Sequence, residues 1–155
     1  MAVKINLNSK EGAKQIEYCL RNRSADLLKM AGIEFFRQAI IATPVDTGRA
    51  RMGWNTTINE PSNEVPPPAP DGHKGKSKGG SEYYPMPKVK ASLIAGVVKI
   101  TDKIFITNRV PYIGRLNNGY SKQAPARFVE RAAERVQAAV SKLWKQTSWK
   151  PEKRS

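Results

Sequence analysis

The stretch that separates the longest helical pattern of this chain from its first strand pattern reads Thr43-Pro44-Val45-Asp46-Thr47-Gly48-Arg49-Ala50-Arg51-Met52-Gly53-Trp54. We call it the joint. Pro44 disfavours helical geometry at the residue before it. Asp46 can accept the amide of Gly48 in an Asx turn, and Gly48 tolerates a positive φ. The chain is therefore expected to turn sharply here.

Two guanidinium groups follow this turn. In an extended segment Arg49 and Arg51 point to the same side of the chain, with Trp54 close behind. Paired arginines can hold carboxylates or phosphates. The alternative is a plain helix-to-strand connection whose arginines are solvated. The joint by itself does not decide between an anion-binding turn and a plain connection.

Length and charge limit the number of domains and the kinds of partner that this chain is expected to have. A chain of 155 residues favours one domain with one core. Lysine and arginine number 27 against 13 aspartate and glutamate, a net charge of +14, so the surface favours acidic partners or nucleic acid. Cys19 and His73, each the sole residue of its type, leave no disulfide and too few ligands for zinc. We expect a reducing compartment, no metal and no cofactor.

The start of the chain predicts neither a signal peptide nor a membrane anchor. Met1–Asn6 alternates apolar and polar residues, and no apolar run approaches the length of a membrane span. The chain is therefore expected to be made and used in the cytoplasm. The alternation over 3–8 predicts a short strand at a sheet edge.

From about Ser9 to Ala42 the pattern is helical, with Ser9 as a cap and Asn22 and Ser24 as a break between two helices. Its apolar surface is wider than one stripe, which favours either a subunit contact or a thick single core. After the joint, Trp54–Asn59 predicts a strand. The segment Pro61–Pro87, which we call the insertion, is rich in proline, glycine and lysine and predicts flexibility. Its lysines either contact an acidic partner or nucleic acid, or are solvated.

The last third of the chain predicts two strands and a closing helix. Ser92–Ile100 and Lys103–Asn108 favour an antiparallel hairpin. The second loop, Asn108–Pro125, has a turn at Asn118-Gly119. Pro125 suits the first turn of a helix with a buried stripe at Phe128, Ala132, Val136, Ala139, Val140 and Leu143. The predicted fold is α+β over 1–146, an antiparallel sheet packed by an N-terminal and a C-terminal helix, with a flexible insertion at 61–90 and a basic tail at 147–155.

No constellation of residues predicts catalysis. His73 lies in the stretch expected to be least ordered, and Cys19 lies within a helical pattern as a small buried hydrophobe. Gly75-Lys76-Ser77 matches the end of a phosphate-binding loop, but Pro70 stands where that motif needs glycine, and no buried strand precedes it. We expect a protein that is not an enzyme; a small hydrolase is the remotest alternative.

Two blocks of the sequence together resemble a known family. Pro44-Val45-Asp46-Thr47-Gly48-Arg49-Ala50-Arg51 is similar to that family's Pro-Val-Asp-Thr-Gly-Arg-Leu-Arg segment. The later block comprises Pro111-Tyr112, Leu116, Gly119, Ser121, Gln123-Ala124-Pro125 and Val129. In this order and spacing, between a long helix and a closing helix, they resemble the head-tail connection and tail-completion (neck) proteins of long-tailed bacteriophages. The resemblance covers most of Ile16–Val140 outside the insertion.

The resemblance implies a structural virion protein with a helix-backed sheet. It implies a ring at the neck or at the top of the tail, a hexamer in preference to a dodecamer, that joins head to tail. Its implied partners are copies of itself, the neighbouring connector and tail-tube or tail-terminator proteins, and passing DNA held without sequence specificity. Such a protein is made in the host cytoplasm and ends in the virion. A flexible insertion would then order only on meeting the next ring.

The chain departs from the family at two places. Asn117 or Asn118 stands where the family has an acidic residue, and Arg127-Phe128 stands where many members have Gly-Met. A salt bridge from that acidic residue is therefore not carried over. Arg49 and Arg51 are expected to grip a carboxylate of the same subunit or of a neighbour. The residues expected at contacts are Asp46, Thr47, Gly48, Arg49, Arg51, Trp54, Lys74, Lys76, Lys78, Tyr83, Tyr84, Tyr112, Arg115, Asn118, Gly119 and Gln123.

A basic nucleic-acid-binding protein is the alternative from another class. The net charge of +14, the lysines between glycines and Tyr83-Tyr84 favour it. No recognised reading helix or stacking motif accompanies them. Affinity for DNA measured over a series of salt concentrations separates the two interpretations.

Overall fold

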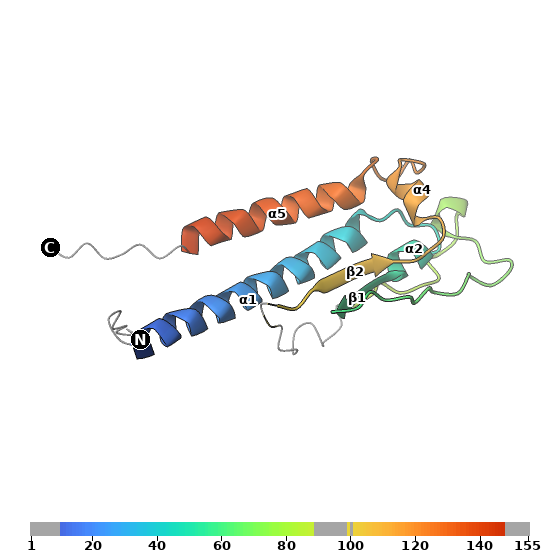
Figure 1. Cartoon of the computed structure of the whole chain (residues 1–155). Helices are drawn as coiled ribbons and strands as arrows, with labels where there is room; N and C mark the ends of the chain where they lie inside the picture. Colours follow the sequence, from blue (N-terminus) through green and yellow to red (C-terminus); the bar gives the residue numbers. More distant parts are fainter. Residues whose placement is uncertain (1–9, 89–98, 100, 148–155) are drawn as a thin grey trace.

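The fold is α+β, with a long helix at the centre of three layers. The computed structural model describes residues 10–88, 99 and 101–147. Helix α1 (Lys10–Ala42) lies between helix α5 (Phe128–Thr147) and a two-stranded sheet, and α5 runs back along α1 in the opposite direction (Figure 1). The joint, the insertion and the second loop gather where α1 ends and α5 begins (Figure 1). The strand predicted over 3–8, the strand over Ser92–Ile100 apart from Lys99, and the tail beyond Thr147 lie outside the described residues.

Helix α1 is continuous, so the predicted break at Asn22 and Ser24 is wrong. Neither residue type removes a backbone hydrogen bond as proline would, and tertiary packing outweighs their weak preference against helix. The helix ends at Ala42, where the Thr43 amide still donates to the Ala39 carbonyl at 3.1 Å. Pro44 prevents the next turn.

The joint contains a helical turn instead of an extended segment. Gly48 adopts a left-handed conformation with φ of 88°, as the sequence predicts, and α2 (Arg49–Met52) follows it directly. Arg49 and Arg51 are therefore about 200° apart around a helix axis, and the expectation that both point to one side is wrong. The Asp46 carboxylate accepts the Ser77 hydroxyl at 2.6 Å in place of the predicted Asx turn.

The sheet pairs the strand after the joint with the strand before the second loop. Strand β1 (Trp54–Ile58) is antiparallel to β2 (Ile104–Asn108), with Trp54 opposite Asn108 and Ile58 opposite Ile104. Both strands lie where the sequence predicts strands. The face of β1 that carries Trp54 and buried Thr56 is turned to α1, which is the alternation expected of a half-buried strand.

The core lies where the three layers meet. Its fully packed members are Phe36, Ala39, Ile40, Trp54 and Phe128. The indole N–H of Trp54 donates to the Thr43 hydroxyl at 2.8 Å, and that hydroxyl donates to the Ala39 carbonyl at 2.6 Å. The end of α1 and the start of β1 are thereby tied together inside the core.

Helix α5 confirms the predicted stripe in its first half only. Phe128, Ala132 and Val136 are buried, whereas Ala139 and Leu143 are exposed. The helix begins three residues after Pro125, and Arg127 holds a positive φ of 61° in between. The second loop also contains a short helix, α4 (Ile113–Asn117), where the sequence predicts only a loop and a turn. The predicted turn is present, with Gly119 at φ of 89°.

Candidate protein-interaction site

The insertion lies against one side of the joint. The Lys76 amide donates to the Asp46 carbonyl at 3.0 Å, and the amides of Tyr83 and Tyr84 both donate to the Thr47 carbonyl, at 2.8 and 3.0 Å. A 3-10 turn, η1 (Lys76–Lys78), carries the Ser77 hydroxyl that bonds Asp46. Composition predicts flexibility for this segment, and that remains a prediction. Its hydrogen bonds show a defined course that composition does not indicate.

Glycine makes this approach possible. A Cβ added at Gly48 would lie 2.7 Å from the Glu82 side chain and 2.8 Å from the Tyr84 carbonyl oxygen. A Cβ at Gly75 would lie 1.9 Å from an Asp46 carboxylate oxygen. Real Cβ atoms do not approach other atoms this closely. The joint and the insertion therefore fit together only because both carry glycine at the contact.

Arg51 faces the insertion. Its guanidinium lies 3.5 Å from the Glu82 carboxylate, with both side chains less than a fifth exposed, and Lys76 reaches the other Glu82 oxygen at 3.2 Å. The expectation that Arg51 grips a carboxylate of its own subunit is met by Glu82. Arg51 Nε and Glu82 Oε1 make no hydrogen bond within the described part of the chain. The pair is thus held by the attraction of opposite charges at 3.5 Å more than by hydrogen-bond geometry.

The second loop approaches the joint from another side. The Gln123 side-chain carbonyl accepts the Val45 amide at 2.9 Å, across 78 residues of sequence. The Asn108 side-chain amide donates to the Ala50 carbonyl at 2.7 Å. The Arg49 guanidinium lies 6.0 Å from the centre of the Tyr112 ring, at the limit of cation–π distance. The two blocks that carry the family resemblance therefore contact each other directly.

A cleft of about 420 Å³ lies between the joint and the second loop. Its lining includes Pro44 to Ala50 of the joint, Ser77 of the insertion, and Tyr112, Leu116 and Tyr120 to Gln123 of the second loop. Burial is the largest cause that raises the pKa of Tyr112 above its usual value, and the nearby Arg49 acts in the opposite direction. The phenol is therefore neutral at pH 7 and presents a hydroxyl, not a charge.

Asn117 connects the second loop to the start of α5. Its side-chain oxygen accepts the Val129 amide at 3.0 Å, and its side-chain nitrogen donates to the Glu130 carboxylate at 2.9 Å. This hydrogen bond is the largest cause that lowers the pKa of Glu130. Asn117 thus caps the start of α5 through the Val129 amide.

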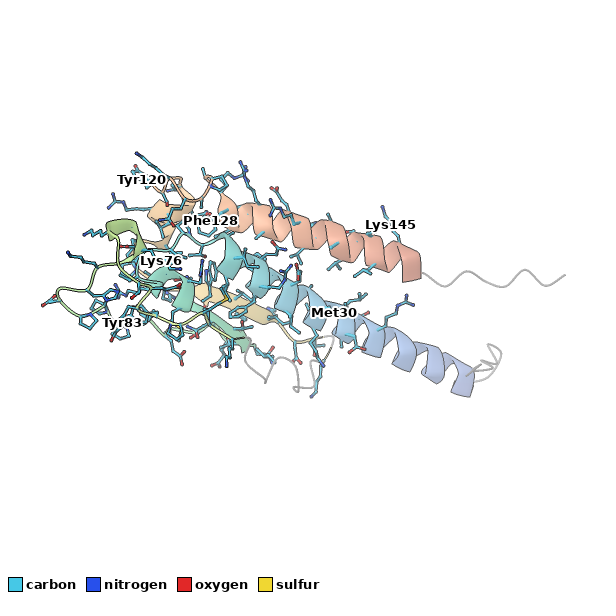
Figure 2. The ribbon with its side chains drawn as sticks, turned by 180° about the vertical axis from the view of Figure 1, so that it is seen from behind. Met30, Lys76, Tyr83, Tyr120, Phe128 and Lys145 are labelled. Carbon is cyan, nitrogen blue, oxygen red and sulfur yellow. The ribbon has the colours of Figure 1, made fainter. Side chains whose placement is uncertain are left out.

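The remaining predicted contact residues divide between the core and the surface. Trp54 and Tyr84 are buried, and the Tyr84 hydroxyl donates to the Pro67 carbonyl. Tyr83 is 48% exposed and meets His73 edge to face, and Tyr120 is 73% exposed beneath Arg115. Figure 2 shows Lys76, Tyr83 and Tyr120 at the same end of the molecule. Lys74, Lys78, Asn118 and Gly119 are exposed.

Sequence reasoning missed four residues that shape this site. Ser77 and Glu82 of the insertion anchor the joint, Asn108 ties β2 to α2, and Lys122 lines the cleft. For Glu82 a signal exists in the sequence, because it is an acidic residue beside Tyr83-Tyr84 in a lysine-rich segment. The other three give no sign, since serine and lysine are common in loops and an asparagine at the end of a strand is equally ordinary.

A second hollow, of about 470 Å³, lies between the far halves of α1 and α5. Its walls are mainly apolar and come from Leu27, Leu28 and Ala31 of α1 and from Val140 of α5. Met30 and Ile41 of α1 are more than half exposed. The apolar surface that the sequence shows on more than one side of this helix is thus only partly covered within the described chain.

Among the described residues, no three histidine, cysteine, aspartate or glutamate side chains gather as a metal-binding group would. Nor does any helix in that part of the chain have the length and apolar character needed to cross a membrane. Comparison with protein-family models, with curated proteins and with solved structures finds no match for this chain.

Proposed function

We propose that this chain is a structural protein of a tailed-phage virion, made in the host cytoplasm, that forms or completes a ring joining head to tail. The observation that carries the proposal is the contact between the two blocks of the family resemblance. Arg49 and Val45 of the first block meet Tyr112 and Gln123 of the second. Because both blocks line the same cleft, we propose that they act together in binding a neighbouring protein.

The apolar surfaces support assembly into a ring. A ring needs two different faces that fit each other around a rotation axis. Met30 and Ile41 leave part of α1 exposed, and a second, mainly apolar hollow lies between the far halves of α1 and α5. Exposed apolar patches on a soluble chain mark interaction surfaces. We propose a hexamer, with a dodecamer as the alternative.

The test uses a phage whose copy of this gene is silenced and supplied from a plasmid. The Arg49→Ala, Arg51→Ala variant should leave separate heads and tails in electron micrographs and lower the infectious titre. Because Arg51 pairs with partly buried Glu82, Arg49→Ala alone is the cleaner probe, and its fold is checked by circular dichroism. Lys142→Ala on the exposed side of α5 is the control for lost charge. Normal joining by the double variant would contradict the proposal.

The mass of the protein gives an independent test. Native mass spectrometry of the purified chain, alone and mixed with connector particles, should show a closed ring in at least one of the two conditions. A chain that stays monomeric in both would exclude the ring.

Nucleic-acid binding remains the second candidate, because Lys74 and Lys78 are exposed and have no ion pair among the described residues. Electrostatic binding to a duplex weakens steeply as salt rises. Tight binding of duplex DNA at physiological salt would favour this candidate. Loss of binding between low and physiological salt would favour the structural role.

A further inference from the structure

The two arginines of the joint differ in what they have available to bind. Arg51 already has a carboxylate, that of Glu82. Arg49 donates through Nε to the Pro66 carbonyl at 2.9 Å, and no carboxylate within the described chain lies at ion-pair distance from it. Its two terminal nitrogens form a planar fork suited to a carboxylate. Arg49 is partly buried in the lining of the cleft.

The charges around the cleft are unequal. Arg49 and Lys122 line it, and Lys122 has no ion pair among the residues described. Asp46 is the acidic residue in the same lining, and one of its oxygens accepts the Ser77 hydroxyl. Ser77 thus supplies a hydrogen bond to one oxygen of that carboxylate, and two cations stand against its single negative charge. The cleft favours an anion.

The walls of the cleft are suited to a peptide. Pro44, Val45 and Leu116 are apolar, Tyr112 is partly buried with a neutral phenol, and the volume falls in the usual range for ligand pockets. A peptide that alternates acidic and apolar side chains can pair a carboxylate with Arg49 while an apolar side chain enters the cleft. The phosphates of a duplex offer no apolar group to such walls, because the bases are stacked inside; a single strand is therefore the comparison to test.

The occupant is better matched by another protein than by a second copy. The cleft favours an anion, and an acidic segment of a different protein meets that preference better than a second copy of this chain, whose net charge is +14. We propose that the cleft is a docking site for an acidic, partly apolar segment of a neighbouring protein, with Arg49 as the carboxylate anchor and Lys122 as a supporting charge. Placing that neighbour in the virion rests on the proposed function; the binding chemistry does not.

The test is fluorescence anisotropy with a labelled peptide in which glutamate and leucine alternate. A peptide with glutamine for glutamate and a short oligothymidylate serve as comparison probes. At physiological salt the glutamate peptide should bind best, and Arg49→Gln should weaken it about tenfold, the equivalent of about 1.4 kcal/mol. Arg49→Lys should restore only part of the affinity, because lysine lacks the planar fork. Lys122→Gln should have a smaller effect of the same sign.

The matched control is Lys142→Gln, which removes the same charge from an exposed position on α5. It should leave the affinity unchanged, and the melting temperature of every variant is measured beside wild type. Equal binding of the glutamate and glutamine peptides would overturn the proposal. So would an equal loss in Lys142→Gln, or tighter binding of the oligothymidylate than of the glutamate peptide. These outcomes do not affect the results expected in the ring and head-tail experiments. Failure of the docking-site proposal can therefore be distinguished from failure of the proposed function.

Discussion

The two sides of the joint are held by different kinds of contact. On the insertion side, the Arg51–Glu82 pair is mostly buried, and Gly48 and Gly75 allow backbone and side chains to approach closely. On the cleft side, Val45 and Ala50 are held by the neutral side chains of Gln123 and Asn108. Buried charges and close packing are costly to disturb, whereas neutral bonds at a partly solvated edge are not. We infer that the insertion side provides stability and the cleft side remains accessible to a partner.

The largest effect should come from the glycine at the centre of the insertion side. Gly48→Ala forces an alanine into the left-handed backbone conformation, which costs about 1–2 kcal/mol. Its added Cβ also clashes with the Tyr84 carbonyl and the Glu82 side chain, which costs about 1–3 kcal/mol more. Gly72→Ala is the matched control, since Gly72 has a similar φ of 82° but nothing within 4 Å of its added Cβ. Urea denaturation of both variants measures the difference. Equal destabilisation would show that the insertion does not press on the joint.

The next effect compares the two arginines. Arg51→Gln leaves the Glu82 carboxylate partly buried, with Lys76 as its one remaining cationic partner among the described residues. It should destabilise the fold by about 2 kcal/mol. Arg49→Gln loses one bond to a carbonyl, at Pro66, and should cost less than about 1 kcal/mol. Thermal unfolding of both variants checks the order. A reversed order would mean that the cleft side is the one that holds the joint.

The smallest effect concerns Asn117, beside the cleft. Asn117→Ala removes a helix cap at Val129, worth about 1 kcal/mol. It should also raise the pKa of Glu130 toward its ordinary value, because the hydrogen bond from Asn117 is the largest cause that lowers it.

The pH dependence of stability follows from this shift. A carboxylate with a depressed pKa in the folded state stabilises the fold above its unfolded pKa, and that contribution is lost as the pH falls through the folded pKa. The variant should therefore lose less stability than wild type on acidification, as an NMR titration of Glu130 and unfolding at two pH values would show. An unchanged Glu130 titration would mean that the bond is not maintained in solution.

Patterns of apolar residues predicted the main elements, and contacts between distant residues decided the rest. The helix ending at Ala42, both strands of the described sheet and the closing helix follow from periodicity and from Pro44. The helical turn of α2 and the helix α4 are short, and helices of four or five residues carry too little periodicity to be recognised. The course of the insertion depends on backbone amides that meet Asp46 and Thr47. Composition contains no information about such bonds.

The candidate site shows the same limit. Arg49, Arg51, Tyr112 and Gln123 were expected to act at contacts, and the structure brings them around one joint. That the arginines face different parts of the chain could not be predicted, because it depends on the helical turn between them. Ser77 could not be assigned for a related reason, since its partner Asp46 lies 31 residues earlier in the chain.

The bond between Val45 and Gln123 spans 78 residues, and the bond between Asp46 and Ser77 spans 31. Contacts of such separation form slowly, since the intervening chain must first be ordered. During synthesis the joint emerges from the ribosome early but cannot be completed until Gln123 has followed. The joint is thus among the first structured parts of this protein to be made and among the last to finish folding. The cleft comes into existence only when nearly the whole described chain has been made.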